Sequence, residues 1–127
     1  MYLLDTNIIS YWMRGDKRVI GRIKKHAPAD LSLSTITLAE ILYGIEKSPI
    51  KKQERRLKIK QISSLLVIYP FEEAAAGKYA IIRAQLEREG MVISERDTQI
   101  ASIAKANKLT VVTHNVKEFG RIGKLKV

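Results

Sequence analysis

The sequence predicts an α/β fold in which a central parallel sheet of four to five strands carries helices on both faces. One observation leads to this fold class, and a second indicates a single domain. Short apolar segments alternate with longer amphipathic segments along the whole chain, a pattern typical of parallel strands joined by crossover helices. The 127 residues, 46% of them hydrophobic, suit one domain with its own core. We therefore expect a single domain that spans residues 1–127.

Four segments are predicted to be strands because they are short, apolar and bounded by cap or turn residues. They are Tyr2–Leu4, Leu31–Ser34, Leu65–Tyr69 and Leu109–Thr113. Pro70 closes the third segment, since proline cannot donate a hydrogen bond to a strand ladder. Helical patterns follow each of the first three strands, which favours parallel pairing.

The predicted helices are the segments in which apolar residues recur at helical spacing. They span residues 6–15, Lys17–His26, Thr37–Ile45, Ile50–Ser64, Glu72–Glu89 and Ser94–Asn107. Thr6 and Asn7 supply cap chemistry for the first helix, and Gly90 ends the fifth. We expect the chain after Thr113 to be irregular.

The chain is strongly basic, with 23 Lys and Arg residues against 13 Asp and Glu residues and a formal net charge of +10. Such a charge attracts polyanions such as nucleic acid, although it also serves solubility alone. Basic residues concentrate in Lys47–Lys60, and the candidates for RNA contacts there are Lys51, Lys52, Arg55 and Arg56. The segment contains no aromatic residue, so it suits the phosphate backbone better than stacked bases. A solvated helix face is the structural alternative.

Composition also excludes some classes of protein. The chain has no cysteine, which excludes disulfides and thiolate metal sites. It has no run of 18 apolar residues, and its first residues lack the features of a signal peptide. We therefore expect a cytoplasmic protein that does not interact with membranes.

Three acidic residues follow a strand or begin a helix, which is where α/β proteins place functional side chains. Asp5 follows the first strand, Glu40 lies early in the third helix, and Asp97 lies in the first turn of the last predicted helix. Each has a structural alternative. Asp5 is a favourable N-cap, and Glu40 completes a capping box with Thr37. Asp97 follows the cap residue Ser94 by three positions.

The three acids are most informative together, because the carboxyl ends of parallel strands meet at one edge of a sheet. Carboxylates that share this edge would raise each other's pKa, and a hard divalent cation would relieve their repulsion. Ligation by oxygen alone favours Mg²⁺ or Mn²⁺ over zinc. His26 and His114 lack the spacing of metal ligands. We therefore predict a Mg²⁺ or Mn²⁺ site built from Asp5, Asp97 and Glu40.

Polar residues near the strand ends extend this candidate site. Asn115 follows the last strand and can hydrogen-bond a metal-bound water or ligate through its carbonyl oxygen. Glu118 is a second candidate acid in the same turn. Thr6 can orient Asp5 through its hydroxyl, and Thr113 supplies a hydroxyl at the end of the last strand. Capping and loop roles are the alternatives for these residues.

Four blocks of the sequence, in this order, resemble the motifs of the PIN-domain family, particularly the VapC-type toxins of bacterial toxin–antitoxin pairs. The blocks are Leu4–Tyr11, Ile36–Gly44, Ile93–Ala101 and Val111–Ile122. The resemblance implies a PIN-like three-layer α/β/α sandwich and a Mg²⁺- or Mn²⁺-dependent endoribonuclease. It implies that Asp5, Glu40 and Asp97 bind the metal and that Asn115 is the fourth catalytic position. It also implies a cognate VapB-like antitoxin and a homodimer.

Two positions depart from the family pattern. Many members carry Asp at the position of Asn115, which weakens the case for a second metal ion, and many carry Gly at the position of Ser94. The hypothesis is metal-assisted hydrolysis of RNA, with transfer, ribosomal and messenger RNA all open as targets. The alternative is a non-catalytic RNA-binding or antitoxin-binding PIN module. An aspartyl-phosphate phosphatase is disfavoured, because Asn7 stands where such enzymes carry a general acid.

Overall fold

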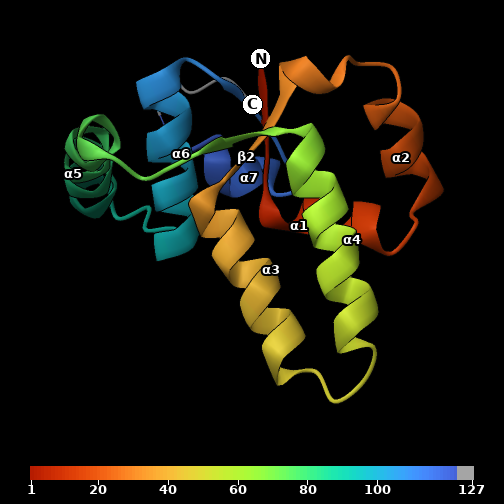
Figure 1. Cartoon of the computed structure of the whole chain (residues 1–127). Coiled ribbons are helices and arrows are strands. Elements are labelled where there is room, and N and C mark those ends of the chain that lie inside the picture. The colour runs from red at the N-terminus through yellow and green to blue at the C-terminus, as the bar shows by residue number, and fades with distance from the viewer. Residues whose placement is uncertain (123–127) are drawn as a thin grey trace.

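The computed structural model describes residues 1–122 and contains the predicted parallel sheet at its centre (Figure 1). The strands are β1 (Tyr2–Leu4), β2 (Leu31–Ser34), β3 (Val67–Tyr69) and β4 (Thr110–Val112). All strand pairs are parallel, and the strand order is β3-β2-β1-β4. The predicted α/β class is therefore confirmed, with four strands in the described residues.

Helices connect the strands. They are α1 (Thr6–Met13), α2 (Lys17–Ile23), α3 (Thr35–Lys47), α4 (Lys52–Leu65), α5 (Glu73–Glu89), α6 (Glu95–Asn107) and α7 (Val116–Phe119), with a 3₁₀ helix at Pro28–Asp30. All six predicted helices are present, with shifted ends. None of the helices in residues 1–122 is both long and apolar enough to cross a bilayer.

Two predictions about the elements are wrong. The third strand begins at Val67 rather than Leu65, because Leu65 still belongs to the last turn of α4. The chain after Thr113 is not wholly irregular, since α7 forms there. A helix of four residues is too short to show a periodic pattern in the sequence. Residues 123–127, the rest of the predicted irregular tail, lie outside the described part of the chain.

The core has two halves, one on each face of the sheet. Leu3 is buried in a cluster with residues of α5, α6 and α7, whereas Leu4 is buried in a cluster with residues of α1 to α4. Adjacent strand residues point to opposite faces, so one short strand supplies both halves. Figure 1 shows α5 and α6 on one side of the sheet and α1, α2 and α4 on the other. The helices therefore cover both faces, as predicted.

The start of α3 differs from the predicted capping box. Ser34, the last residue of β2, is the N-cap, and its Oγ accepts a hydrogen bond from Thr37 N at 3.0 Å. The helix therefore begins at Thr35, and Thr37 is not its cap. Ser34 and Thr37 are both favourable cap residues. Ser34 is the cap because β2 ends at this residue and α3 begins at the next. Glu40 lies in the second turn, so the structural role proposed for it from sequence is wrong.

The strand order reverses between β1 and β4. The chain places β2 and then β3 on one side of β1, and it returns to place β4 on the other side. In open parallel sheets a crevice forms beyond the carboxyl ends of the strands at such a reversal. Asp5 and Thr113 are the residues that directly follow β1 and β4. The topology therefore predicts a functional site around these two side chains.

Candidate metal centre

Asp5 lies at the centre of the candidate site. Its side chain is 3% exposed, and its Oδ1 accepts a hydrogen bond from Ile8 N at 3.0 Å. Its Oδ2 accepts a hydrogen bond from the hydroxyl of Thr113. The predicted capping role of Asp5 is therefore confirmed, and the carboxylate is held between the first turn of α1 and the end of β4.

Thr113 and Asn115 connect Asp5 to Asp97. While the Thr113 hydroxyl donates to Asp5, its Oγ1 accepts a hydrogen bond from Asn115 N at 2.8 Å. Asn115 Nδ2 in turn donates to Asp97 Oδ2 at 3.2 Å. Three of the four predicted catalytic residues therefore lie in one hydrogen-bonded network, which also includes the predicted supporting residue Thr113.

Glu118 belongs to the same network, more firmly than its place in the sequence indicated. Asn115 Nδ2 donates to Glu118 Oε2 at 2.7 Å, because Asn115 is the N-cap of α7 and Glu118 lies three positions later. Gly120 ends this helix, and a Cβ there would lie 2.8 Å from Val116 O, so the turn requires glycine. The contact between Glu118 and Asn115 could have been predicted from the Asn-x-x-Glu spacing, which is typical of a helix start.

Glu40 lies beside this network rather than within it. Thr6 Oγ1 donates to Glu40 Oε1 at 3.3 Å, and Arg96 Nη1 lies 3.6 Å from Glu40 Oε2. Thr6 Oγ1 also lies 3.1 Å from Thr37 Oγ1. Thr6 is thus a supporting residue for Glu40, whereas Thr113 supports Asp5. No spacing or motif in the sequence indicates that Arg96 pairs with Glu40.

Burial dominates the electrostatics of Asp5. It raises the pKa of the Asp5 carboxyl, and the hydrogen bonds from Thr113 and Ile8 offset the increase only in part. The nearby His114 ring also acts to lower this pKa. A carboxyl group whose pKa is raised by burial at the end of a strand is a candidate functional group.

Asp97 and Glu118 perturb each other's pKa in opposite directions. Burial is the largest cause that raises the pKa of Asp97 to about 7, together with the hydrogen bond and negative charge of Glu118 and the charge of Asp5. The pKa of Glu118 is lowered, chiefly by the hydrogen bond with Asp97. Of the two carboxyl groups, Asp97 therefore takes up a proton more readily, and Glu118 keeps its negative charge more readily.

The donor set fits a hard divalent cation. Every candidate donor is an oxygen, as Mg²⁺ and Mn²⁺ prefer, and a cation would offset the repulsion that raises the pKa of Asp97. Within residues 1–122, no three acidic or histidine side chains form a ready-made metal-binding group. Glu40 is engaged by Thr6 and Arg96. The oxygen donors of Asp5, Asp97 and Glu40 therefore suit such an ion by their chemistry, although Glu40 already has protein partners.

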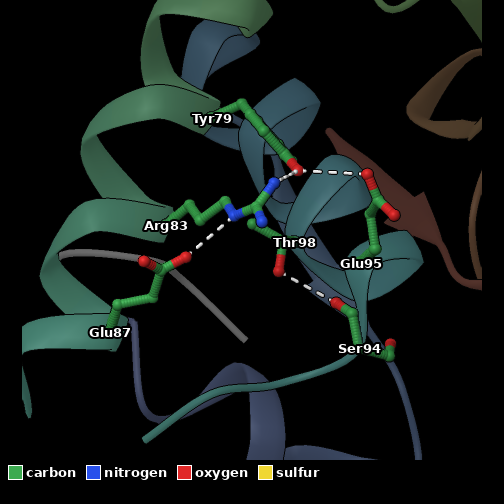
Figure 2. A network of polar contacts seen from close by, with 6 residues as sticks. All are labelled: Tyr79, Arg83, Glu87, Ser94, Glu95 and Thr98. Atoms are coloured by element: carbon green, nitrogen blue, oxygen red, sulfur yellow. Dashed lines mark hydrogen bonds and ion pairs between the residues drawn. The ribbon is translucent and has the colours of Figure 1, made fainter. Parts of the chain in front are cut away.

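A polar network between α5 and α6 fixes the helical turn that carries Asp97 (Figure 2). Tyr79 OH donates to Glu95 Oε1 at 3.2 Å and accepts a hydrogen bond from Arg83 Nη1 at 3.0 Å. Ser94 Oγ caps the same turn by accepting from Asp97 N at 3.2 Å. The position of Asp97 is therefore set by its own helix cap and by the neighbouring helix.

A groove of about 720 Å³ begins at Glu40 and continues between α1, α3 and α4. We call it the α4 groove. Lys51, Arg55 and Lys58 line its α4 side, and their spacing places them on one face of the helix. Two of the four predicted RNA contacts, Lys51 and Arg55, therefore face the groove that leads to the acids.

The other two predicted RNA contacts do not line the α4 groove. Arg56 forms an ion pair with Glu46 of α3, and the charge of Lys52 also acts on Glu46. These two basic residues thus contribute to the contact between α3 and α4, which run side by side as a hairpin (Figure 1).

The sequence matches the family model described as PIN domain over residues 2–125. Ribonuclease VapC2 of Haemophilus influenzae is 34% identical over 122 residues, which cover 95% of this chain and 91% of that protein. The tRNA(fMet)-specific endonuclease VapC of Shigella flexneri is 30% identical over 125 residues, which cover 98% of this chain and 94% of that protein.

A solved structure shows the same architecture. The crystal structure of VapBC2 from Rickettsia felis, bound to a DNA fragment from their promoter, contains a chain with 35% sequence identity to this one. The two chains superpose with a TM-score of 0.91, over 98% of this chain and 95% of that chain. The similarity therefore extends over the whole domain, including the strand ends that carry the acids.

Proposed function

Because this chain belongs to the PIN-domain family, and within it to the VapC-like group, we propose that it is a metal-dependent endoribonuclease and the toxin of a toxin–antitoxin pair. The observation that carries the proposal is the network that joins Asp5, Asp97, Asn115 and Glu118 at the ends of β1 and β4. A gathering of acids on a protein with a net charge of +10 suits both a cation and a polyanionic substrate.

In this proposal Asp5, Asp97 and Glu40 would hold Mg²⁺ or Mn²⁺. When bound, such an ion would polarise a phosphoryl oxygen and lower the pKa of a water molecule. Thr113 fixes the orientation of the Asp5 carboxylate through its hydroxyl. Asn115 is the fourth catalytic residue, because its Nδ2 holds Asp97 and its side-chain carbonyl oxygen, which has no hydrogen bond among residues 1–122, can orient water or the scissile phosphate.

Transfer RNA is the first substrate to test, because one relative is named as a tRNA(fMet)-specific endonuclease. A VapB-like antitoxin is the expected protein partner, because the solved relative is a VapBC2 complex. Exposed apolar side chains on α3 and α5, such as Tyr43 and Ile81, supply surface for the antitoxin or for a homodimer. The protein would act in the cytoplasm, where its RNA substrate is found.

Removal of the metal tests this function directly. Purified protein is expected to cut total RNA into discrete fragments in Mg²⁺ or Mn²⁺ and to leave it intact in EDTA, with cleavage restored when excess metal is added. Gel electrophoresis and fragment sequencing would identify the target. Cleavage that persists in EDTA would contradict the metal centre. Intact RNA that is nevertheless bound tightly would favour the alternative, a non-catalytic RNA-binding module.

Loss of the Thr113 hydroxyl is expected to lower cleavage about 10- to 100-fold, the usual cost of removing a partner that orients a metal ligand. Thr113→Val removes the hydrogen bonds to Asp5 and Asn115 and keeps the shape of the side chain. Thr110→Val is the matched control, because Thr110 lies in β4 outside the network. Equal cleavage rates for the two variants would show that Thr113 has no positioning role.

The α4 groove is expected to bind the RNA backbone. Lys51→Glu with Arg55→Glu should weaken RNA binding about tenfold or more and reduce its dependence on salt. Lys60→Glu with Lys78→Glu makes the same change in net charge at exposed residues outside the groove and should have a smaller effect. Fluorescence anisotropy at several salt concentrations measures both. Identical losses for the two pairs would mean that only net charge matters.

A further inference from the structure

A second groove, of about 970 Å³, lies against the other face of α1 and extends along α2. We call it the α2 groove. Its lining includes Ile8 and Tyr11, whereas the α4 groove is lined by Thr6 and Ser10, so the two grooves use different faces of α1. Thr113, which donates to the Asp5 carboxylate, lies in the lining of the α2 groove. The α4 groove therefore reaches the candidate site at Glu40, and the α2 groove reaches it at Thr113.

The α2 groove carries a row of basic side chains. Arg18, Arg22 and Lys25 line it, at a spacing that keeps them on one face of α2 and its C-terminal extension. No ion pair within residues 1–122 engages any of the three. The acid in the lining, Asp16, uses its carboxylate to accept hydrogen bonds from Arg18 N at 3.0 Å and Val19 N at 3.1 Å. The row is therefore available to phosphates.

Aromatic rings stand beside these cations. The Tyr11 and His114 rings meet edge to face at 5.2 Å, and the Tyr2 and His26 rings do so at 5.0 Å. Buried Leu4 and other apolar side chains also line the groove. Rings over an apolar floor offer flat faces to nucleobases, and a neighbouring row of cations matches the phosphates of the same strand. The α4 groove has the cations, but its lining contains no aromatic residue.

We propose that the α2 groove binds a single-stranded segment of the RNA substrate on one side of the scissile bond, opposite to the segment held in the α4 groove. Arg18, Arg22 and Lys25 contact its phosphates, and His114, next to Tyr11, stacks on a base close to the acids. The strand must be single there, because a base in a duplex has no free face. This inference rests on the proposed nuclease function. It adds a location, the α2 groove, at which the substrate is selected.

Charge reversal tests the row of cations. Binding of a short labelled single-stranded RNA to the full chain in EDTA would be measured by anisotropy over a range of salt concentrations. The test variant is Arg18→Glu with Arg22→Glu, and the matched control is Lys17→Glu with Lys24→Glu, which are exposed residues of the same helix region outside the groove. The test pair should weaken binding about tenfold or more and flatten the salt dependence, and the control pair should have a clearly smaller effect.

Substitution of His114 tests stacking. His114→Ala should weaken RNA binding about fivefold or more, and His114→Phe should retain it, because phenylalanine keeps a ring but no charge. An acidic peptide in the groove would respond to the arginines alone. Loss of binding in both His114 variants, or in neither, would therefore overturn the stacked base.

The outcomes separate this inference from the nuclease proposal. Normal metal-dependent cleavage with equal losses in the two charge-reversed pairs rejects the α2 groove and keeps the nuclease. The expected binding pattern without any cleavage in Mg²⁺ or Mn²⁺ keeps the groove and rejects the nuclease. Failure of the unsubstituted protein to bind the labelled RNA rejects the α2 groove, and the nuclease is then judged by cleavage in Mg²⁺ or Mn²⁺ alone.

Discussion

Replacement of Asp5 by Asn is expected to lower RNA cleavage by more than about a hundredfold, which is the upper cost of losing a residue that only orients a ligand. The charge that would hold the metal disappears in this variant. The fold should survive, because asparagine is also a favoured N-cap and its carbonyl oxygen can accept from Ile8 N, as Asp5 Oδ1 does at 3.0 Å. Activity and stability therefore respond separately to this one substitution.

The measurement is the cleavage rate of the identified RNA at saturating Mg²⁺ or Mn²⁺, together with the thermal unfolding midpoint. Asp30→Asn is the control, since Asp30 is an exposed acid in the 3₁₀ helix, away from the site. Its cleavage rate should be unchanged. A normal cleavage rate in the Asp5→Asn variant would show that Asp5 is only a helix cap, and it would contradict the proposed metal centre.

Replacement of Asp97 by Asn is expected to stabilise the metal-free protein at alkaline pH while it abolishes cleavage. The pKa of Asp97 rises from 3.8 to about 7 on folding, so the folded chain binds this proton more tightly than the unfolded chain does. The stability from the protonated carboxyl is fully present below about pH 4 and is lost as the pH rises through about 7. Asparagine resembles the protonated acid at every pH and avoids this loss.

The difference in unfolding free energy between Asp97→Asn and the unsubstituted protein should be close to zero at pH 4. It should rise to about 1–2 kcal/mol in favour of the variant above pH 8, after allowance for the partial exposure of the side chain. Glu118 contributes in the opposite direction. Because folding lowers its pKa, its contribution to the stability of the folded protein is lost as the pH falls. Denaturant titrations in EDTA at several pH values measure the difference. A constant difference would show that Asp97 ionises normally.

The fold could be predicted because its signals are local. The four strands are short apolar runs and the six long helices show clear periodicity, so their order alone specified a parallel sheet with helices on both faces. The missed element, α7, has four residues, of which Phe119 is buried in the core. A helix of about one turn is too short to show a periodic pattern of its own.

The site could be predicted only in part. Asp5, Asp97 and Asn115 were identified because strand ends and helix starts are visible in sequence, and the topology brings those positions together. The pairing of Glu40 with Arg96 joins α3 to α6, and the strength of the Glu118 contact depends on α7. Neither contact follows from spacing. The roles of these side chains in catalysis stay predictions until the variants are measured.

The sheet has an exposed edge, and the net charge of the protein opposes aggregation at this edge. β3 ends the strand order, and its Val67 and Ile68 are 40% and 38% exposed, which is the kind of edge on which chains aggregate. A net charge of +10 keeps copies of the protein apart in dilute salt. Bound RNA or high salt cancels that repulsion. Colloidal stability should therefore be lowest at the salt concentrations that release RNA during purification, when the edge is least protected by charge.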